Sequence, residues 1–250
     1  MNCRVYVDFD GTIVPSDATD TIFERFAAPS WRDVEREWQA GKIGSRECIT
    51  RQVSMLRAGR SELLASLDPI QIDPDFPEFM RTFSAAGIGI TIVSDGFDLV
   101  IETLLQRYGL DVPHFANHLE PDADGRWRVS FPFAHAECIS LSGHCKCSRT
   151  ESHPAALKVV IGDGRSDYCI AGRADLVLAK ATLLDLCRVS GTPCVPFASF
   201  ADASSKLADW LAGRLRPERT AAGQGSRGQG RGGDNNELLL ETNREATFQS

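Results

Sequence analysis

The sequence lacks long apolar runs and has no excess of basic residues. No stretch approaches the roughly 20 consecutive apolar residues that a membrane-spanning helix needs. Residues 1–5 lead into a strand-like run without the apolar core of a signal peptide. We therefore expect a cytoplasmic protein with no membrane partner. The formal charge is −7, from 27 basic and 34 acidic residues. The phosphate backbone of a nucleic acid repels such an acidic body, so we expect no nucleic-acid partner.

Apolar side chains are absent from residues 223–233, which consist of Gly, Gln, Ser and Arg. Such a stretch cannot offset the entropy lost on ordering, and the composition shifts from residue 213, so residues 213–250 are predicted to be a disordered tail. The 223–233 stretch contains only two arginines and no aromatic residue for base stacking, which argues against RNA binding. Across the whole chain 42% of residues are hydrophobic, which excludes disorder throughout.

Eight cysteines could form four disulfides, but a protein of 250 residues with a full core does not need them. We expect reduced thiols that mostly act as small buried apolar groups. Cys138, Cys145 and Cys147 differ, because they fall in one short segment with His135 and His144. Their spacing, C-x6-C-x-C, matches no common structural zinc pattern, and the role of this loop stays open.

The body of the chain alternates short β-branched runs with helical periods, which predicts an α/β fold with a Rossmann-like parallel sheet. Strands are predicted at residues 4–7, 88–93, 158–161 and 175–178, and helices at 76–86, 99–108, 166–172 and 181–189. Residues 116–131 are predicted to form a hairpin that turns at Asp124-Gly125.

Residues 15–72 contain no convincing strand and are predicted to form a helical cap inserted after the first strand. Four helices are expected there, at 17–26, 31–39, 45–56 and 61–67. The predicted core then consists of residues 1–14 and 73–212.

Three predicted strands are followed by polar segments that contain glycine. In an open parallel sheet, ligands bind beyond the carboxyl ends of the strands, so segments distant in sequence can converge there. The segments are Asp8-Phe-Asp10-Gly-Thr12, Ser94-Asp95-Gly96 and Gly162-Asp163-Gly-Arg-Ser-Asp167.

Together these segments bring three carboxylates, those of Asp8, Asp10 and Asp163, to one place. Without a counter-charge some of them would become protonated. Mg²⁺ prefers carboxylate and carbonyl oxygens and leaves coordination positions for a phosphate. The Ser94 hydroxyl and nearby backbone N–H groups are suited to phosphate oxygens. The sequence therefore predicts a site for Mg²⁺ and a phosphate. Its predicted phosphate-binding residues are Thr12, Ser94, Asp95, Gly96 and Lys146.

At these residues the sequence resembles the haloacid dehalogenase (HAD) superfamily of phosphatases, whose first motif is D-x-D-x-T and whose fourth is G-D-x-x-x-D. The resemblance covers about residues 3–200. It implies that Asp8 is the nucleophile that forms an aspartyl-phosphate and that Asp10 is the general acid and base. It further implies that Asp163 binds Mg²⁺ beside Asp8 and the carbonyl of Asp10, that Ser94 binds the phosphate, and that Asp167 orients the cluster.

A cation that neutralises the phosphoryl oxygens is also expected. Lys158 heads its strand and would lie at the far edge of the sheet, well over ~10 Å from Asp163. Lys146 and Arg149 remain. We favour Lys146, because a lysine supplies a compact charge and this one precedes a candidate capping box, Ser148-x-x-Glu151. Arg149 stays open as the alternative.

The insert after the first motif matches the subfamily (IB) that contains phosphoserine phosphatase. That enzyme usually has Ser-Gly-Gly at its second motif, and the Asp95 found here argues against phosphoserine. Residues 15–20 and 26–31, with the cysteine-containing loop near Lys146, resemble phosphatases related to the 2-hydroxy-3-keto-5-methylthiopentenyl-1-phosphate phosphatase of methionine salvage. The resemblance implies that the partner is a small phosphorylated metabolite of keto-sugar type.

Three alternatives stay open: phosphoserine phosphatase-type activity, a haloacid dehalogenase, and a non-catalytic protein with this fold. A dehalogenase has no use for Asp10 and Asp163 around a metal, and a non-catalytic protein would be expected to lack one of these residues. The sequence leaves the oligomeric state open.

Overall fold

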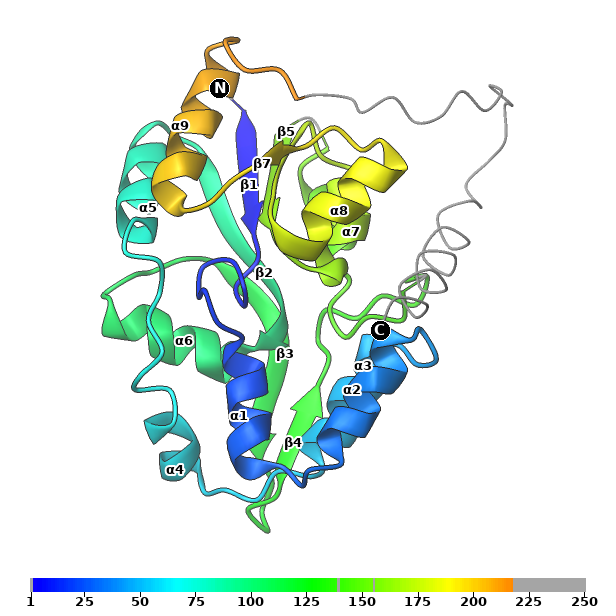
Figure 1. Ribbon diagram of the computed structural model, residues 1–250. Helices are drawn as coiled ribbons and strands as arrows, with labels where there is room; N and C mark the ends of the chain where they lie inside the picture. The colour runs from blue at the N-terminus through cyan, green and yellow to red at the C-terminus, as the bar shows by residue number, and fades with distance from the viewer. Residues whose placement is uncertain (1, 139, 155, 218–250) are drawn as a thin grey trace.

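The computed structural model describes residues 2–138, 140–154 and 156–217, which contain one seven-stranded sheet (Figure 1). The strand order is β4-β3-β2-β1-β5-β6-β7. Neighbours pair in parallel except β3 and β4, which are antiparallel. The predicted parallel α/β fold is confirmed. The strands are β1 (Cys3–Val7), β2 (Gly89–Phe97), β3 (His114–Pro121), β4 (Trp127–Ser130), β5 (Leu157–Gly162), β6 (Leu176–Ala179) and β7 (Val195–Pro196).

The central strand, β1, is buried on both faces, which explains its continuous apolar sequence. Val5 and Val7 belong to the large apolar cluster on one face, and Tyr6 belongs to a smaller cluster on the other. The parallel neighbours of β1 are β2 and β5, which pair with Val5 through Ile90 and Val159. The chain leaves β1 toward β2 in one direction and returns to β5 in the other, so the crevice beyond β1 is a topological switch point.

Helices cover both faces of the sheet. The large cluster includes Phe79 of α5, Leu104 of α6 and Phe200 of α9, whereas α7 and α8 supply Ile170 and Leu183 to the clusters on the opposite face. Figure 1 shows the same division, with α5 and α9 on one side of β1 and α7 and α8 on the other. These elements are α5 (Phe76–Ala85), α6 (Asp98–Arg107), α7 (Tyr168–Ala171), α8 (Ala181–Ser190), α9 (Phe200–Leu211) and the 3₁₀ helices η1 (Lys146–Ser152) and η2 (Arg165–Asp167).

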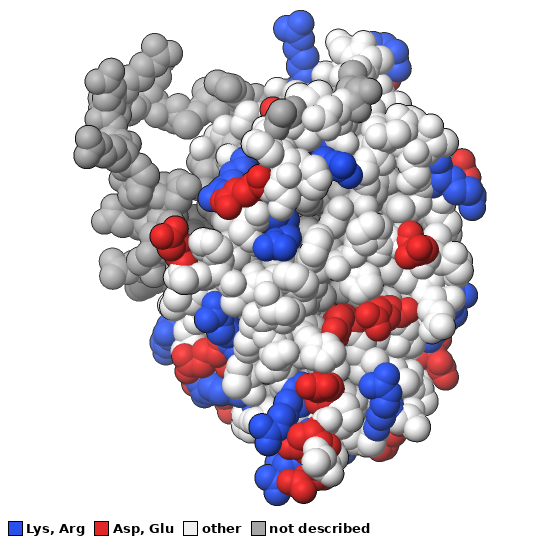
Figure 2. All heavy atoms as spheres, turned by 180° about the vertical axis from the view of Figure 1, so that it is seen from behind, with Lys and Arg blue, Asp and Glu red and all other residues white. Residues whose placement is uncertain are grey.

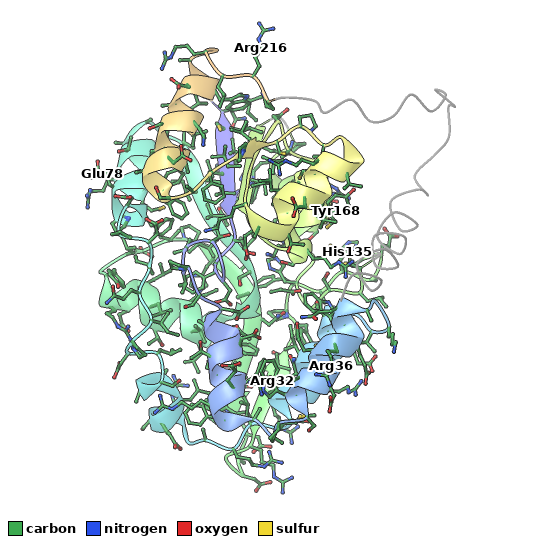
Figure 3. All side chains as sticks on the ribbon, in the orientation of Figure 1. Arg32, Arg36, Glu78, His135, Tyr168 and Arg216 are labelled. Atoms are coloured by element: carbon green, nitrogen blue, oxygen red, sulfur yellow. The ribbon has the colours of Figure 1, made fainter. Side chains whose placement is uncertain are left out.

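Four helices lie between β1 and α5, in the lower half of Figure 1: α1 (Ala18–Phe26), α2 (Trp31–Gln39), α3 (Ser45–Val53) and α4 (Arg60–Ala65). Asp17 caps α1 by accepting a hydrogen bond from the Asp20 N–H, at 2.7 Å. Arg32 and Arg36 lie along α2 (Figure 3), where Arg32 pairs with Glu24 of α1. Phe23 packs in the same apolar cluster as the sheet, so these helices share a continuous core with it.

The predicted hairpin is present as β3 and β4, with the turn at Gly125. It reaches the inserted helices, because Trp127 donates from its indole N–H to the Ala58 carbonyl at 2.8 Å. The prediction that the second strand ends at residue 93 is wrong. β2 continues to Phe97, which pairs with Asn117 of β3 after a register shift.

The predicted disordered tail, residues 213–250, lies outside the described residues from 218 onward. No helix among the described residues is long and apolar enough to cross a membrane. Figure 2 shows basic and acidic side chains interspersed over the face turned to the viewer, without a continuous basic surface on the described part of that face.

Candidate active site

The segment that follows β1 forms a tight turn at the switch point. The Asp8 N–H donates to the Ile161 carbonyl at 2.9 Å, which extends the pairing of β1 with β5 by one residue. Gly11 then adopts a φ of 70°. A Cβ at Gly11 would lie 2.2 Å from Oδ2 of Asp163, so a side chain there would displace that carboxylate. Glycine is therefore required for the turns after β1 and β5 to approach one another.

Lys146 lies at the centre of the converging segments, and its side chain is only 1% exposed. Its Nζ lies 2.9 Å from Oδ1 of Asp8 and 2.7 Å from Oδ1 of Asp167, and donates to Oγ of Ser166 at 3.0 Å. These contacts use the three N–H donors of the ammonium group. Burial alone lowers the pKa of this lysine, but the charges of Asp167 and Asp8 outweigh it and raise the pKa, so Lys146 stays charged.

The carboxylates of Asp8, Asp163 and Asp167 have ligand atoms within 4.8 Å of one another. Burial and the charge of Asp167 raise the pKa of Asp8, and the same two causes raise the pKa of Asp163. Three carboxylates beside one ammonium group carry two negative charges in excess when all are ionised, and a divalent cation would neutralise them. The donors are all oxygens, which are the ligands that Mg²⁺ prefers.

Thr12 supports this group from the turn after β1. Thr12 is 1% exposed, and its hydroxyl donates to Oδ1 of Asp163 at 2.9 Å. The structure therefore gives the Thr12 side chain a protein partner, and its predicted contact with phosphate stays a prediction.

The carboxyl group of Asp10 lies apart from the three clustered carboxylates. Its Oδ1 accepts from the Ala18 N–H at 2.8 Å and its Oδ2 from the Thr19 hydroxyl at 3.0 Å, both at the start of α1. Burial and the charge of Asp17 raise the pKa of Asp10 to about 8. A carboxyl group that holds its proton near neutral pH can act as a general acid. With both carboxyl oxygens bonded to α1, the carbonyl oxygen of Asp10 is left for a metal, as the family resemblance implies.

The end of β2 completes the site. Oγ of Ser94 accepts from the Gly96 N–H at 3.0 Å. A Cβ at Gly96 would lie 2.7 Å from Oδ2 of Asp10, so this glycine lets the Asp10 carboxyl pack against the strand. Both carboxylate oxygens of Asp95 accept bonds from the protein, from the Ser45 hydroxyl and the His144 N–H. The predicted contact of Asp95 with the substrate phosphate stays a prediction.

Arg149, the alternative cation, lies elsewhere. Its guanidinium group stacks 5.1 Å from the ring centroid of Phe115 and 5.3 Å from that of Phe133, and it donates to the Ser148 hydroxyl. The predicted capping box at Ser148 is wrong. A 3₁₀ helix begins at Lys146 instead, and the Ser148 hydroxyl donates to the Cys145 carbonyl.

A cavity of about 190 Å³ lies over Asp8 and Asp10 and is bounded by both the sheet end and the inserted helices. Sequence reasoning missed that the insert contributes three acidic side chains to this cavity, those of Asp17, Asp20 and Glu35. Burial and the charges of Asp17 and Glu35 raise the pKa of Asp20 to about 7. Asp20 and Glu35 lie on different helices, and each looks in the sequence like a charged residue on a solvated helix face. The sequence therefore held no signal that these side chains line a cavity. Ser166, a further contact of Lys146, lies within the segment Gly162–Asp167, but sequence reasoning gave it no role.

All eight cysteines are free thiols. Sγ of Cys145 lies 3.4 Å from Sγ of Cys147. Among the described residues, the three clustered aspartates are the only set of three or more metal-binding side chains with all ligand atoms within 4.8 Å. Cys138, His135 and His144 are therefore not gathered with this thiol pair into such a set.

The comparisons with known proteins agree with this geometry. A family model described as haloacid dehalogenase-like hydrolase matches residues 5–172. Two relatives bear the name 2-hydroxy-3-keto-5-methylthiopentenyl-1-phosphate phosphatase. The one from Exiguobacterium sp. (strain ATCC BAA-1283 / AT1b) is 30% identical over 83% of this chain and 98% of its own. The one from Geobacillus kaustophilus (strain HTA426) is 33% identical over 81% of this chain and 94% of its own.

Among solved structures, the fold is similar to a phospho-aspartyl intermediate analogue of phosphoserine phosphatase. The TM-score is 0.57 at 21% identity, over 74% of this chain and 90% of that one. This likeness concerns the fold alone. The family match and the similarity along almost the whole length of the named relatives go further: the chain belongs to the haloacid dehalogenase-like hydrolase family and is a phosphatase.

Proposed function

We propose that this phosphatase hydrolyses the monoester of a small phosphorylated metabolite, with Mg²⁺ as cofactor and Asp8 as nucleophile. The observation that carries the proposal is the gathering of Asp8, Asp163 and Asp167 within 4.8 Å, with the Lys146 ammonium group on two of them. A buried carboxylate at the floor of a cavity, held by a lysine, is positioned to attack a phosphorus atom.

The carboxylates of Asp8 and Asp163, with the carbonyl of Asp10, would hold Mg²⁺. The ion supplies positive charge that draws electrons from the phosphoryl oxygens and offsets repulsion between the phosphate and Asp8. Asp167 bonds Lys146 at 2.7 Å and accepts from the Gly164 N–H at 3.2 Å, so it orients both the lysine and the turn that carries Asp163.

In the first step an oxygen of Asp8 attacks phosphorus, and the bond between phosphorus and the leaving oxygen breaks. Asp10 gives its proton to that oxygen, so the alcohol leaves neutral. In the second step the Asp10 carboxylate takes a proton from water, whose oxygen attacks the phosphorus. The bond to Asp8 breaks, inorganic phosphate is released, and both aspartates return to their starting states. A pKa of about 8 for Asp10 suits both roles near neutral pH.

Residues 15–72 act as the cap in this proposal. The cavity over Asp8 is closed on one side by Phe23, Trp38 and Cys48 of the inserted helices, which would shield an aspartyl-phosphate from bulk water. A cavity of about 190 Å³ has room for a small alcohol, and we expect phosphoproteins to be poor substrates. The named relatives favour a keto-sugar phosphate of methionine-salvage type as the substrate.

A panel of phosphate esters tests the proposal. Purified protein is assayed for phosphate release from 2-hydroxy-3-keto-5-methylthiopentenyl-1-phosphate, other keto-sugar phosphates, phosphoserine and p-nitrophenyl phosphate, with and without Mg²⁺. Chloride release from 2-chloropropionate provides the dehalogenase comparison. We expect Mg²⁺-dependent hydrolysis with the highest kcat/KM on a keto-sugar phosphate. A preference for phosphoserine would overturn the substrate assignment, and hydrolysis that survives complete chelation would overturn the metal assignment.

A further inference from the structure

The N-terminus of α3 packs tightly against the loop that precedes Lys146. The Arg46 N–H donates to the Leu141 carbonyl at 3.3 Å, and the Arg46 guanidinium group donates to the Ser142 carbonyl at 3.3 Å. A Cβ at Gly44 would lie 2.5 Å from Cβ of Leu141 and 2.7 Å from its carbonyl oxygen. Only glycine permits so close an approach. We call residues 44–46 and 141–144 together the α3–loop interface.

Asp95 lies at the centre of this interface, although it belongs to β2. Its Oδ2 accepts from the Ser45 hydroxyl at 2.7 Å, and its Oδ1 accepts from the His144 N–H at 2.8 Å. The Ser45 oxygen in turn accepts from the Gly143 N–H at 3.1 Å. One carboxylate therefore joins the end of the sheet, the first turn of α3 and the loop. Asn117 fixes the Asp95 backbone by donating to its carbonyl at 2.6 Å.

The loop side of this network leads directly to Lys146. His144 is 1% exposed, and its Nδ1 bonds the Ser94 carbonyl at 3.0 Å. Burial lowers the pKa of His144 to about 4, so the ring is neutral and Nδ1 carries the proton that it donates. Two residues later, Lys146 bonds Asp8 and Asp167. The backbone that Asp95 holds is therefore the backbone that places the lysine.

We propose that Asp95 is a positioning residue that couples the docked state of α3 to the placement of Lys146 against Asp8. The proposal rests on the proposed function for its effect on catalysis. If α3 moves away, Oδ2 of Asp95 loses the Ser45 hydroxyl and the Gly143 N–H loses its acceptor. Buried polar groups without partners are unfavourable, so the loop rearranges when α3 leaves. Under this proposal, Lys146 is held against Asp8 only while the inserted helices cover the cavity.

Ser45→Ala tests the coupling from the insert side, because it removes one hydroxyl and leaves Asp8, Lys146 and Asp95 in place. Hydrogen exchange of the full chain, without any substrate, is followed by mass spectrometry. We expect at least threefold faster exchange in peptides covering residues 141–147 as well as in α3. Ser54→Ala is the matched control, because its hydroxyl lies at the other end of α3, exposed, and bonds only the Arg51 carbonyl. Faster exchange confined to α3 would overturn the coupling.

The catalytic readout separates positioning from substrate binding. Loss of one hydrogen bond to a charged group corresponds to roughly a tenfold effect. We therefore expect Ser45→Ala to lower kcat for p-nitrophenyl phosphate about tenfold with KM unchanged within twofold. A rise in KM at constant kcat would mean that Ser45 contacts the substrate and would overturn the positioning role.

Asp95→Asn tests the coupling from the sheet side, with Asp98→Asn as its control, since Asp98 bonds Leu119 and His118 and not the interface. We expect the double variant with Ser45→Ala to exchange no faster at 141–147 than Asp95→Asn alone, because both changes break one network. Additive effects would contradict the proposal. If wild-type protein released no phosphate, the proposed function would fail while the exchange measurements still decided the coupling.

Discussion

The ammonium group of Lys146 lies 2.9 Å from the carboxylate of Asp8, although the two residues are 138 positions apart in the sequence. Lys146 reaches this position from a 3₁₀ helix, and Asp8 from the end of the central strand. The contact exists only when the loop before η1 and the turn after β1 are both folded. A change in the fold of either segment would therefore break it.

Replacement of Lys146 by methionine tests this contact. Methionine fills much of the volume but leaves Asp8 and Asp167 without their counter-charge. We expect kcat to fall by at least ~100-fold, since two or more hydrogen bonds to charged groups are lost. We also expect the free energy of unfolding without metal to fall by about 3–5 kcal/mol, as when one partner of a buried pair is removed. Steady-state kinetics and urea unfolding measure the two effects.

Arg149→Met provides the comparison for that experiment. Arg149 stacks on Phe115 and Phe133 and has no contact with Asp8. Loss of the stacking should cost about 0.5–1 kcal/mol of stability and change kcat less than threefold. The assignment of Lys146 fails if Arg149→Met is the variant that loses activity.

The elements that the sequence predicted best are those whose own residues carry a clear signal. The strands around Val5, Ile90 and Val159 are continuous apolar runs buried on both faces, and the helices from α1 to α4 are separated by Pro and Gly. The structure differs where tertiary pairing decides. β2 continues through Ser94-Asp95-Gly96 because β3 pairs again at Phe97. β7 consists of two residues, Val195 and Pro196, and exists only because β6 lies beside it.

The site could be predicted as far as its motifs lie at strand ends. The carboxylates of Asp8, Asp10 and Asp163 were expected together because parallel strands end at one edge. The structure brings Asp8 and Asp163 together with Asp167, whereas the Asp10 carboxyl group bonds the start of α1 instead. The partners of Asp95 could not be read from sequence, because Ser45 and His144 belong to segments without a motif. Sequence reasoning set Lys146 against Arg149 on chemical grounds alone, and only the fold shows which of them reaches Asp8.

Asp10→Asn should separate the two chemical steps. With p-nitrophenyl phosphate the leaving group departs without help, so the first step survives. The second step needs a base to activate water, and the amide cannot accept that proton. We expect a burst of p-nitrophenol close to one equivalent, followed by turnover at least ~100-fold slower than wild type. Rapid mixing with absorbance detection measures it, and loss of the burst itself would show that Asp10 acts before the phosphoryl group is transferred.

Asp20 should make the protein less stable as pH rises. Its pKa is about 7 in the folded chain, against roughly 4 in an unfolded chain. Between these values the folded state holds a proton that the unfolded state has lost, so the free energy of unfolding falls as pH rises from about 4 to 7. Asp20→Asn should reduce this slope by the contribution of one carboxyl group and be about 1–2 kcal/mol more stable at pH 8, allowing for partial exposure. Urea unfolding at pH 5 and 8 checks this, with exposed Asp33→Asn as control. Equal slopes in wild type and Asp20→Asn would refute the assignment.

Mg²⁺ should stabilise the folded protein by binding to the carboxylates of Asp8 and Asp163. A ligand that binds only the folded state raises Tm, by an amount equivalent to about 2.7 kcal/mol at a hundred times its Kd. We expect Mg²⁺ to raise the Tm of the wild type and to leave the Tm of Asp163→Asn unchanged. Ca²⁺ should bind but inhibit hydrolysis, because its larger and looser coordination shell misplaces Asp8. Calorimetry with each ion measures binding without reference to activity. A Tm that rises equally in Asp163→Asn would locate the ion elsewhere.

The central claim is that Asp8 carries the phosphoryl group during turnover. Wild-type protein is mixed with Mg²⁺ and p-nitrophenyl phosphate, quenched in acid within the first turnover, digested and analysed by mass spectrometry. The account predicts a phosphoryl group on the peptide that contains Asp8, sensitive to hydroxylamine, and none in an Asp8→Asn variant that stays folded. A phosphoryl group on another residue, or an Asp8→Asn variant within tenfold of wild-type activity, a barrier change of only about 1.4 kcal/mol, would contradict it.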